Sequence, residues 1–343
     1  MPYTPNPDWD TPIFSGDLTG SWHTCDLSDI IDSEGRYLVF LMVTQVVGCP
    51  SDPNIIGARP TDSSLSFRNT VTCPSGAACT GLYYIGDQSI ISQITDSVSS
   101  IQLRSDRTQT VAVRLLGWLP WTSDDSELFP SGEFPSTWTD LDLSSFITRA
   151  GKNFVEIVPV RADVNQCIYG IRRKGDTLDM FDSAYTTGGE NTLGSFSSGV
   201  AASLFMSTDE NKIIQHRQKS TGGLTGTLRF FGYSPYWTPI EEIAFGPAPH
   251  PGGSGVWTDI DLSELVGERS VVVLLKTTRV DPIADVYSIF TPKGFITNHT
   301  TEGSKGASGT YDRGAGFGSY ALVPTDENGV ISWLCNAASI KAN

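Results

Sequence analysis

The strongest constraint on the fold is a short motif that occurs three times. The copies share a Trp, an Asp, a Leu and a Ser at matching positions: "GSWHTCDLSDI" (Gly20–Ile30), "STWTDLDLSSF" (Ser136–Phe146) and "GVWTDIDLSEL" (Gly255–Leu265). Their tryptophans, Trp22, Trp138 and Trp257, recur at nearly equal spacing. A repeat of this kind indicates three copies of one structural unit, each the length of an ordinary small domain.

Each motif copy is followed by the same series of predicted strands. A long apolar strand comes first, in Gly35–Val46, Lys152–Ala162 and Arg269–Val280. The next strand ends in a basic or Gly-containing turn, in Tyr169–Asp176 and Tyr287–Gly294. In the first unit we assign this strand to Leu65–Asn69, which places an insertion near residues 49–63.

A hairpin and an exit strand complete the unit. The sequence "TDEN" lies between two apolar runs in Phe205–Arg217 and Leu322–Leu334, a pattern typical of a β-hairpin, and Ile94–Arg104 is the counterpart in the first unit. Units one and two then end alike, in Val111–Thr122 and Gly226–Thr238, where a strand runs into a Gly-aromatic-x-Pro sequence.

The third unit departs from this pattern at its end. The matching exit strand would run past Asn343, and "NAASIKAN" lacks the apolar alternation of an exit strand. We therefore predict that the last strand of unit three is shortened or missing. Because an open sheet edge is usually covered, we expect a neighbouring subunit or another segment to cover this one.

The composition agrees with an all-β chain. Val, Ile, Thr and aromatic residues recur in short runs, and 34 Gly and 20 Pro supply many turns. We predict three tandem antiparallel β-sandwich repeats of jelly-roll or immunoglobulin-like shape, joined by short Pro/Gly-rich linkers. The predicted domains are residues 1–121, 122–237 and 238–343.

Charge and hydropathy exclude some partners. The net charge is −15 and the isoelectric point is about 4.6, so the surface repels phosphate backbones and we expect no nucleic-acid partner. The longest apolar run, Tyr37–Gly48, is too short to span a bilayer. The polar, Pro-rich start of the chain lacks the features of a secretory signal. We expect no membrane insertion.

The motif itself could be a site or a structural element. In an extended strand Trp138, Asp140 and Asp142 share one face, and two carboxylates there could bind Ca²⁺ or act as an acid/base pair. In the first unit Thr24 replaces Asp140, so the pair is not shared. One Asp is present in all copies, as Asp26, Asp142 and Asp261. This favours a structural role, with the Asp capping a turn or a helical turn and the Trp anchoring the core or sheet edge.

No other pattern indicates chemistry. The four histidines lack metal-ligand spacing, and the chain shows neither a phosphate-binding Gly loop nor a nucleophile elbow, so we expect no catalytic, metal or cofactor site. The loop between Cys73 and Cys79 could close as a disulfide or hold two free thiols. The exit aromatics could stack on sugars or pack between units, and we favour packing: Trp118, Trp121, Tyr233, Tyr236 and Trp237.

Tandem units with this motif, long strand, hairpin and exit resemble virion structural proteins of tailed bacteriophages, of the tail, fibre or head-decoration type. The resemblance covers most of the chain and brings no catalytic residues. It implies a non-enzymatic protein that assembles in the host cytoplasm and becomes extracellular with the virion. Other virion proteins, copies of itself and a host-surface glycan are the implied partners. A carbohydrate-binding adhesin array and a secreted bacterial surface protein are the alternatives.

Overall fold

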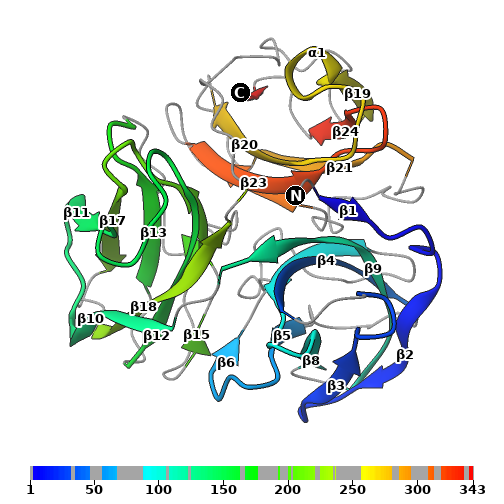
Figure 1. Cartoon of the computed structure of the whole chain (residues 1–343), viewed down its shortest axis with the longest axis horizontal. Coiled ribbons are helices and arrows are strands. Elements are labelled where there is room, and N and C mark those ends of the chain that lie inside the picture. The colour runs from blue at the N-terminus through cyan, green and yellow to red at the C-terminus, as the bar shows by residue number, and fades with distance from the viewer. Residues whose placement is uncertain are drawn as a thin grey trace.

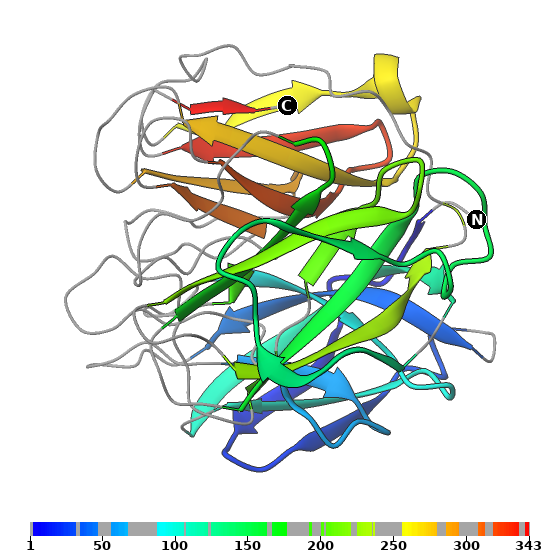
Figure 2. The same ribbon diagram turned by 90° about the vertical axis from the view of Figure 1, so that its left-hand side faces the viewer.

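The computed structural model describes residues 3–31, 35–46, 56–67, 88–105, 108–122, 125–162, 167–176, 192–193, 200–201, 204–220, 225–234, 236, 256–279, 286–294, 308–312, 318–335 and 340–342. Within these ranges the chain is β-stranded apart from the one-turn helix α1 (Ser263–Val266). The strands form three antiparallel β-sandwiches, which we call units one, two and three in chain order. The predicted fold class is confirmed. Figure 1 shows the units grouped around a common centre, and Figure 2 shows them from the side.

Unit one consists of a large and a small sheet. The large sheet has the order β1 (Thr4–Pro5), β9 (Gln109–Trp121), β4 (Arg36–Gln45) and β7 (Gln88–Ile94), and β2 (Pro12–Leu18) also pairs with β9. The small sheet has the order β3 (His23–Asp26), β8 (Ser100–Ser105) and β5 (Ile56–Pro60). The facing sides of the two sheets bury one core, to which Leu41, Val113 and Leu103 contribute.

Unit two repeats this arrangement. Its large sheet is formed by β10 (Ser126–Glu133), β18 (Thr225–Ser234), β12 (Phe154–Arg161), β15 (Val200–Ala201) and β16 (Leu204–Ser207). Its small sheet has the order β11 (Thr139–Asp142), β17 (Ile213–Ser220), β13 (Cys167–Arg173) and β14 (Thr192–Leu193). Val155, Phe230 and Ile214 lie in the core between them.

Unit three has the same two kinds of sheet. The large sheet has the order β23 (Gly318–Pro324), β20 (Val272–Arg279) and β25 (Ile340–Ala342). The small sheet has the order β19 (Thr258–Asp261), β24 (Val330–Cys335), β21 (Val286–Pro292) and β22 (Ser308–Asp312). Its core includes Leu275, Val323 and Trp333.

Main-chain contacts fix which residues are equivalent. The Thr of the Thr-Asp turn in each unit donates its N–H to a main-chain carbonyl at the start of the long strand, in the pairs Thr95–Tyr37, Thr208–Asn153 and Thr325–Val271. Val39, Val155 and Val273 each lie two residues after the accepting residue and are therefore at equivalent positions. In unit one the turn joins β7 and β8, within the predicted segment Ile94–Arg104. In every unit the two strands that flank this turn lie in different sheets, so the predicted β-hairpin is wrong and the turn connects the two sheets of the sandwich.

One predicted strand assignment is wrong. β5 pairs with β8 as β13 pairs with β17 and β21 with β24, so β5 takes the place that we assign to Leu65–Asn69 from sequence. β5 lies inside the predicted insertion near residues 49–63. Part of Leu65–Asn69 instead forms β6 (Ser66–Phe67), which pairs in parallel with β15 of unit two. The true strand was hidden because it is short and ends in a Pro.

The strand of unit three that corresponds to β18 is β25, of which the structure describes Ile340–Ala342. β25 pairs only with Thr277–Arg279, at one end of β20. β18 in unit two pairs with β12 along its whole length, from Phe154 to Arg161. The C-terminal segment "NAASIKAN", which the pattern disfavours as a strand, nevertheless provides the three residues of β25.

The central strands β4 and β12 of the large sheets in units one and two are buried on both sides. In β4 the side chains of Val39 and Leu41 face the sandwich core, whereas Leu38 and Phe40 face the centre of the molecule. A strand buried on both faces is an almost unbroken apolar run, which is what the sequence shows here. The central cluster also includes Phe154, Phe205 and Trp121 and, from unit three, Leu322 and Leu334. Apolar contacts therefore hold the three units together at the middle of Figure 1.

Within the described ranges, no helix has the length and apolar character needed to cross a membrane.

Candidate functional site

The Asp shared by all motif copies caps the turn after the motif strand. Its carboxylate accepts the main-chain N–H of a Ser two residues ahead at 2.8–2.9 Å, in the pairs Asp26–Ser28, Asp142–Ser144 and Asp261–Ser263. Hydrogen bonds from this Ser, through its main chain and hydroxyl, hold the pKa of each carboxyl below its ordinary value. The shared Asp therefore has a local structural contact in every unit.

The second Asp of the motif has a lysine partner. In unit two Lys174 forms an ion pair with Asp140, and Gln215 donates a hydrogen bond to the same carboxylate at 2.9 Å. In unit three Lys293 lies 2.8 Å from Asp259. These lysines are the first cause of the lowered pKa of both carboxyl groups, and each carboxylate in turn raises the pKa of its lysine.

Unit one lacks both members of this pair. The strand register places Thr61 where unit two has Lys174, and Thr24 where unit two has Asp140. The carboxylate and its ammonium are thus present together or replaced together. This explains why the three copies do not share the two-carboxylate pattern: the second Asp occurs only in the units where a lysine next to it forms an ion pair with it.

The lysine also bears on metal binding. Lys174 interacts electrostatically with Asp140, Asp209 and Asp142, so an ammonium already neutralises the carboxylates at this end of unit two. In the part of the chain that the structure describes, no group of three or more His, Cys, Asp or Glu side chains is arranged to hold a metal ion.

In units one and two, two arginine guanidinium groups lie over the ring of the motif Trp. The guanidinium carbons lie 4.2 and 4.6 Å from the ring centre in the set Arg59–Trp22–Arg104, and 4.2 and 5.3 Å in the set Arg172–Trp138–Arg217. These distances are within the range of cation–π attraction. In unit three the register places Thr291 and Leu334 where these arginines stand, next to Trp257. These arginines were not predicted from the sequence, although Arg104 and Arg217 follow the Asp of the Thr-Asp turn at the same offset.

Two of the motif tryptophans, Trp22 and Trp257, pack where one unit meets another. Trp22 of unit one and Leu65 pack against Val158 and Phe231 on the outer face of the large sheet of unit two. Between units two and three, Asp176 and Lys276 form a buried ion pair at 3.3 Å. Such a pair contributes little net stability but is costly to break on one side.

The third contact returns to unit one. Trp257 packs against the central cluster that includes Leu334 of unit three and Met42 and Ile90 of unit one. The strands β22 and β7, which belong to units three and one, also approach each other. Each small sheet therefore contacts the large sheet of the following unit, and the third unit closes the ring onto the first.

The exit aromatics are mostly buried. Trp121 is 6% exposed, meets Phe154 and Phe205 of unit two edge to face, and donates its indole N–H to the carbonyl of Phe231 at 3.0 Å. Trp118 packs against the core of unit one. Tyr233 lies in the core of unit two, whereas the Tyr236 side chain is 49% exposed. Trp237 lies outside the described residues.

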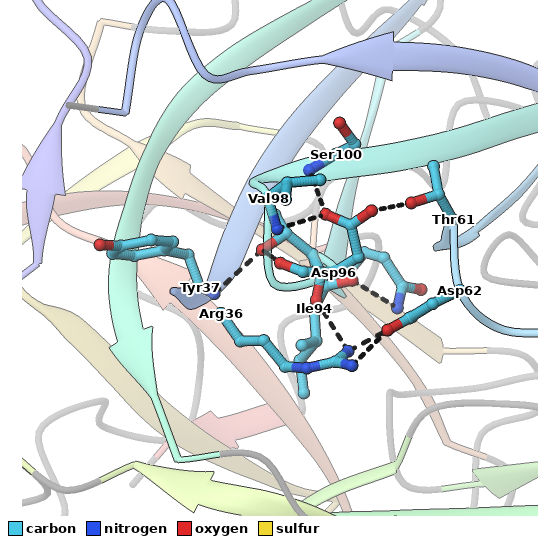
Figure 3. A network of polar contacts seen from close by, with 10 residues as sticks. Arg36, Tyr37, Thr61, Asp62, Ile94, Asp96, Val98 and Ser100 are labelled. Atoms are coloured by element: carbon cyan, nitrogen blue, oxygen red, sulfur yellow. Dashed lines mark hydrogen bonds and ion pairs between the residues drawn. The ribbon is translucent and has the colours of Figure 1, made fainter. Parts of the chain in front are cut away.

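The Thr-Asp turns that connect the two sheets are held by the same main-chain hydrogen bonds to the Asp carboxylate in all three units. In unit one the Asp96 carboxylate accepts main-chain N–H groups of Val98 at 3.0 Å and Ser100 at 2.7 Å, and the Thr61 hydroxyl also bonds to it. Figure 3 shows this network with the neighbouring Arg36–Asp62 ion pair. Asp209 and Asp326 make the same two main-chain contacts in units two and three. These carboxylates are engaged in folding the turn.

One buried titratable pair occurs in the core of unit two. The Tyr169 hydroxyl lies 2.9 Å from Nδ1 of His216, and both side chains are almost fully buried. Burial lowers the pKa of His216 to about 4 and raises that of Tyr169 well above its ordinary value. Both groups are therefore neutral at pH 7 and serve as a hydrogen-bonded core pair.

Cys25 is a buried free thiol, and burial raises its pKa to about 11, which makes it unreactive. Cys73 and Cys79, the candidate disulfide, lie outside the described residues.

Comparisons with known proteins give little further information. No protein-family model matches the chain, and no curated protein matches it. Among solved structures, the N-terminal CBM22-1-CBM22-2 tandem domain of Xyn10C from Paenibacillus barcinonensis is 10% identical over 64% of this chain and 86% of that chain, with a TM-score of 0.19. A TM-score this low supports no conclusion about function.

Proposed function

We propose that the protein is a non-enzymatic structural component of a bacteriophage particle, in the tail, in a fibre or on the capsid surface. The observation that supports this most is the closed ring of three units, in which each small sheet contacts the next large sheet. Symmetric assemblies usually obtain threefold repetition from three separate subunits. A single chain with three equivalent units provides such a body in one piece, as a building block of a larger assembly.

The contacts of the candidate residues also support a scaffold. Asp142 and Asp209 hold turns through main-chain N–H groups, and Asp140 neutralises Lys174. Trp121 fixes unit one against unit two. The groups that could have carried chemistry are thus used to build and join the units, as expected of a rigid structural protein.

The proposed partners are other virion proteins and copies of this chain, with assembly in the host cytoplasm and release in the virion. The net charge of −15 keeps such a body soluble and away from packaged nucleic acid. A contribution to host attachment through a surface glycan is part of this proposal.

Mass spectrometry of phage particles, purified on a density gradient from the lysate that contains the protein, tests this function. The proposal predicts that the chain is found with the major capsid and tail proteins at a constant ratio across the particle peak. Recovery of the chain only in the soluble fraction would contradict it.

A carbohydrate-binding role is the second candidate, and the exposed ring of Tyr236 is the observation that favours it. A glycan array probed with the intact protein and with Tyr236→Ala tests this role. Binding that is lost in the variant would support it, whereas the absence of binding by the intact protein would exclude it for the glycans on the array.

A further inference from the structure

We propose that Arg59 and Arg104, beside Trp22, form a binding site for the carboxylate group of a ligand at the contact of units one and two. The site lies on the small sheet of unit one, next to the large sheet of unit two. This inference does not depend on the proposed function, because it rests on a comparison of two junctions within the chain.

The first observation is that two guanidinium groups are held close together. Their carbons lie 4.2 and 4.6 Å from the centre of the same Trp22 ring, so they are at most about 9 Å apart. Burial and the positive charge of Arg104 lower the pKa of Arg59, so the two cations act on each other. A pair of like charges on an aromatic ring is a favourable place for an anion.

The second observation is that neutral acceptors orient Arg59. Its Nε donates a hydrogen bond to Oε1 of Gln102 at 2.9 Å, and its Nη1 donates one to the carbonyl of Leu65 at 2.9 Å. Within the described ranges no carboxylate raises the pKa of Arg59, whereas Asp125 raises that of Arg229. A guanidinium has further N–H donors beyond these two, and their fork geometry suits a carboxylate.

The third observation is that unit two has the same arginine arrangement. Arg172 donates its Nε to Gln215 at 2.9 Å, as Arg59 does to Gln102. A second arginine also lies over the ring of Trp138. The two junctions can therefore be compared residue by residue.

The turn after the arginine strand differs between these units. The main-chain N–H of Ser63 bonds to the carbonyl of Pro60 at 3.1 Å. The main-chain N–H of Asp176 bonds to the carbonyl of Arg173 at the same distance, so Ser63 and Asp176 are equivalent. Unit two thus places a carboxylate where unit one has a hydroxyl.

The facing unit differs in the same way. The buried carboxylate of Asp176 pairs with Lys276 of unit three at 3.3 Å. Val158 of unit two is the equivalent of Lys276, since each lies five residues after the residue that accepts the Thr N–H. Trp22 packs against the apolar cluster that contains Val158. The second junction therefore holds a carboxylate of the chain itself, whereas the first has the arginines and no carboxylate at the equivalent place.

The surroundings define the ligand further. The neighbouring carboxylates are engaged elsewhere, because Asp62 pairs with Arg36 and Asp96 accepts main-chain N–H groups of its turn. Leu65 and Val160 are partly buried members of the apolar cluster beside Trp22. The ligand that fits is a carboxylate attached to an apolar group.

Benzoate, a carboxylate on an apolar ring, is the probe for the full-length protein. The side-chain Nε–H signals of the arginines, followed by NMR, report where it binds. We expect saturable shifts of the Arg59 and Arg104 signals in the millimolar range. Benzamide, which has the same ring without the charge, should not shift them.

Ser63→Asp tests the comparison without removing an arginine. It supplies the carboxylate of unit two and should weaken benzoate binding at least about tenfold, because a hydrogen bond to a charged group contributes this much or more. Ser63→Asn, of the same size but uncharged, should leave binding unchanged. Arg59→Gln should also weaken binding, whereas Arg229→Gln, which removes the same charge from an arginine paired with Asp125, should not. Urea unfolding of each variant confirms that it is folded.

Three outcomes would overturn the proposal. The first is that benzoate causes no saturable shift at Arg59 and Arg104, or that benzamide shifts them equally. The second is that Ser63→Asp binds benzoate as well as Ser63→Asn does. The third is that Arg59→Gln and Arg229→Gln have the same effect on binding.

Discussion

Units one and two differ from unit three in how the chain leaves the large sheet. In unit one β9 runs along all of β4, and Thr122 at its end already pairs with Tyr233 of unit two. In unit three the last strand has three residues and covers only one end of β20. The exit strand thus completes one sheet and begins the next, and a unit whose exit strand is short keeps a partly exposed edge.

The contacts between the units differ in the same way. Trp22, at the contact of units one and two, lies between two arginines, whereas Trp257, at the contact of units three and one, belongs to the same apolar cluster as Leu334. The residue type beside the motif Trp thus differs between these two contacts.

The largest effect is expected where the exit strand locks two units together. Trp121→Ala should lower the free energy of unfolding by about 3–5 kcal/mol, because it removes a buried indole packed against Phe154 and Phe205. Tyr236→Ala, in the exposed part of the next exit, should change it by less than about 0.5 kcal/mol. Urea unfolding followed by circular dichroism measures both. Equal effects would contradict the role of the exit strand.

A large effect with acid is expected in unit two only. His216 occupies the place of Leu103 in unit one and Trp333 in unit three. Because its pKa is about 4 in the folded protein and about 6.5 when unfolded, the unfolded chain takes up the proton first. The stabilisation is complete above pH 6.5 and is lost as the pH falls to about 4, up to about 3 kcal/mol.

The pH dependence of urea unfolding, compared with that of His216→Leu/Tyr169→Phe, isolates this effect. The double variant removes both members of the hydrogen-bonded pair and should lose less stability between pH 7 and pH 4. If the variant and the natural chain lose the same amount, or if His216 titrates near pH 6.5 by NMR, the buried neutral pair does not exist.

An intermediate effect compares one residue type at equivalent places. Val39→Ala and Val155→Ala should each cost about 2 kcal/mol, because both side chains are fully buried. Val273→Ala should cost about 1 kcal/mol or less, because this side chain is half-buried. Urea unfolding of the three variants gives the ranking. A cost at Val273 equal to the others would show that the edge of β20 is covered.

The smallest effect is expected for the lysine pairs. Lys174→Met should raise the pKa of Asp140 toward its ordinary value, while leaving the free energy of unfolding almost unchanged because the pair is exposed. The lowered pKa means that this small contribution is present above about pH 4 and is lost as the pH falls further. Carboxyl NMR titration measures it, with Asp259 in unit three as the internal control. An unchanged Asp140 pKa would exclude the pairing.

The sequence predicts the parts of the fold that depend on nearby residues. The capped turn after the motif and the Thr-Asp turn are held by hydrogen bonds between residues two to four apart, so both turns are recognisable in each copy. The long strands are recognisable because they are apolar on both faces.

The contacts between strands and between units could not be predicted from the sequence. The arginines over Trp22 come from β5 and β8, which are distant in the chain. The short β5 lacks the pattern of its counterparts, so its place was given to Leu65–Asn69. The second motif Asp was interpretable only when Lys174 was seen on the neighbouring strand. Each of these depends on the packing of distant segments, which no local pattern specifies.

Amide hydrogen exchange along the three equivalent strands β4, β12 and β20 tests the central claim most directly. The three-unit ring with one incomplete sheet predicts slow exchange throughout Leu38–Leu41 and Phe154–Ile157, as in strands paired on both sides. It predicts faster exchange at alternate residues of Val272–Leu275, whose N–H groups point to the open edge. Uniform, slow exchange in all three strands would contradict it.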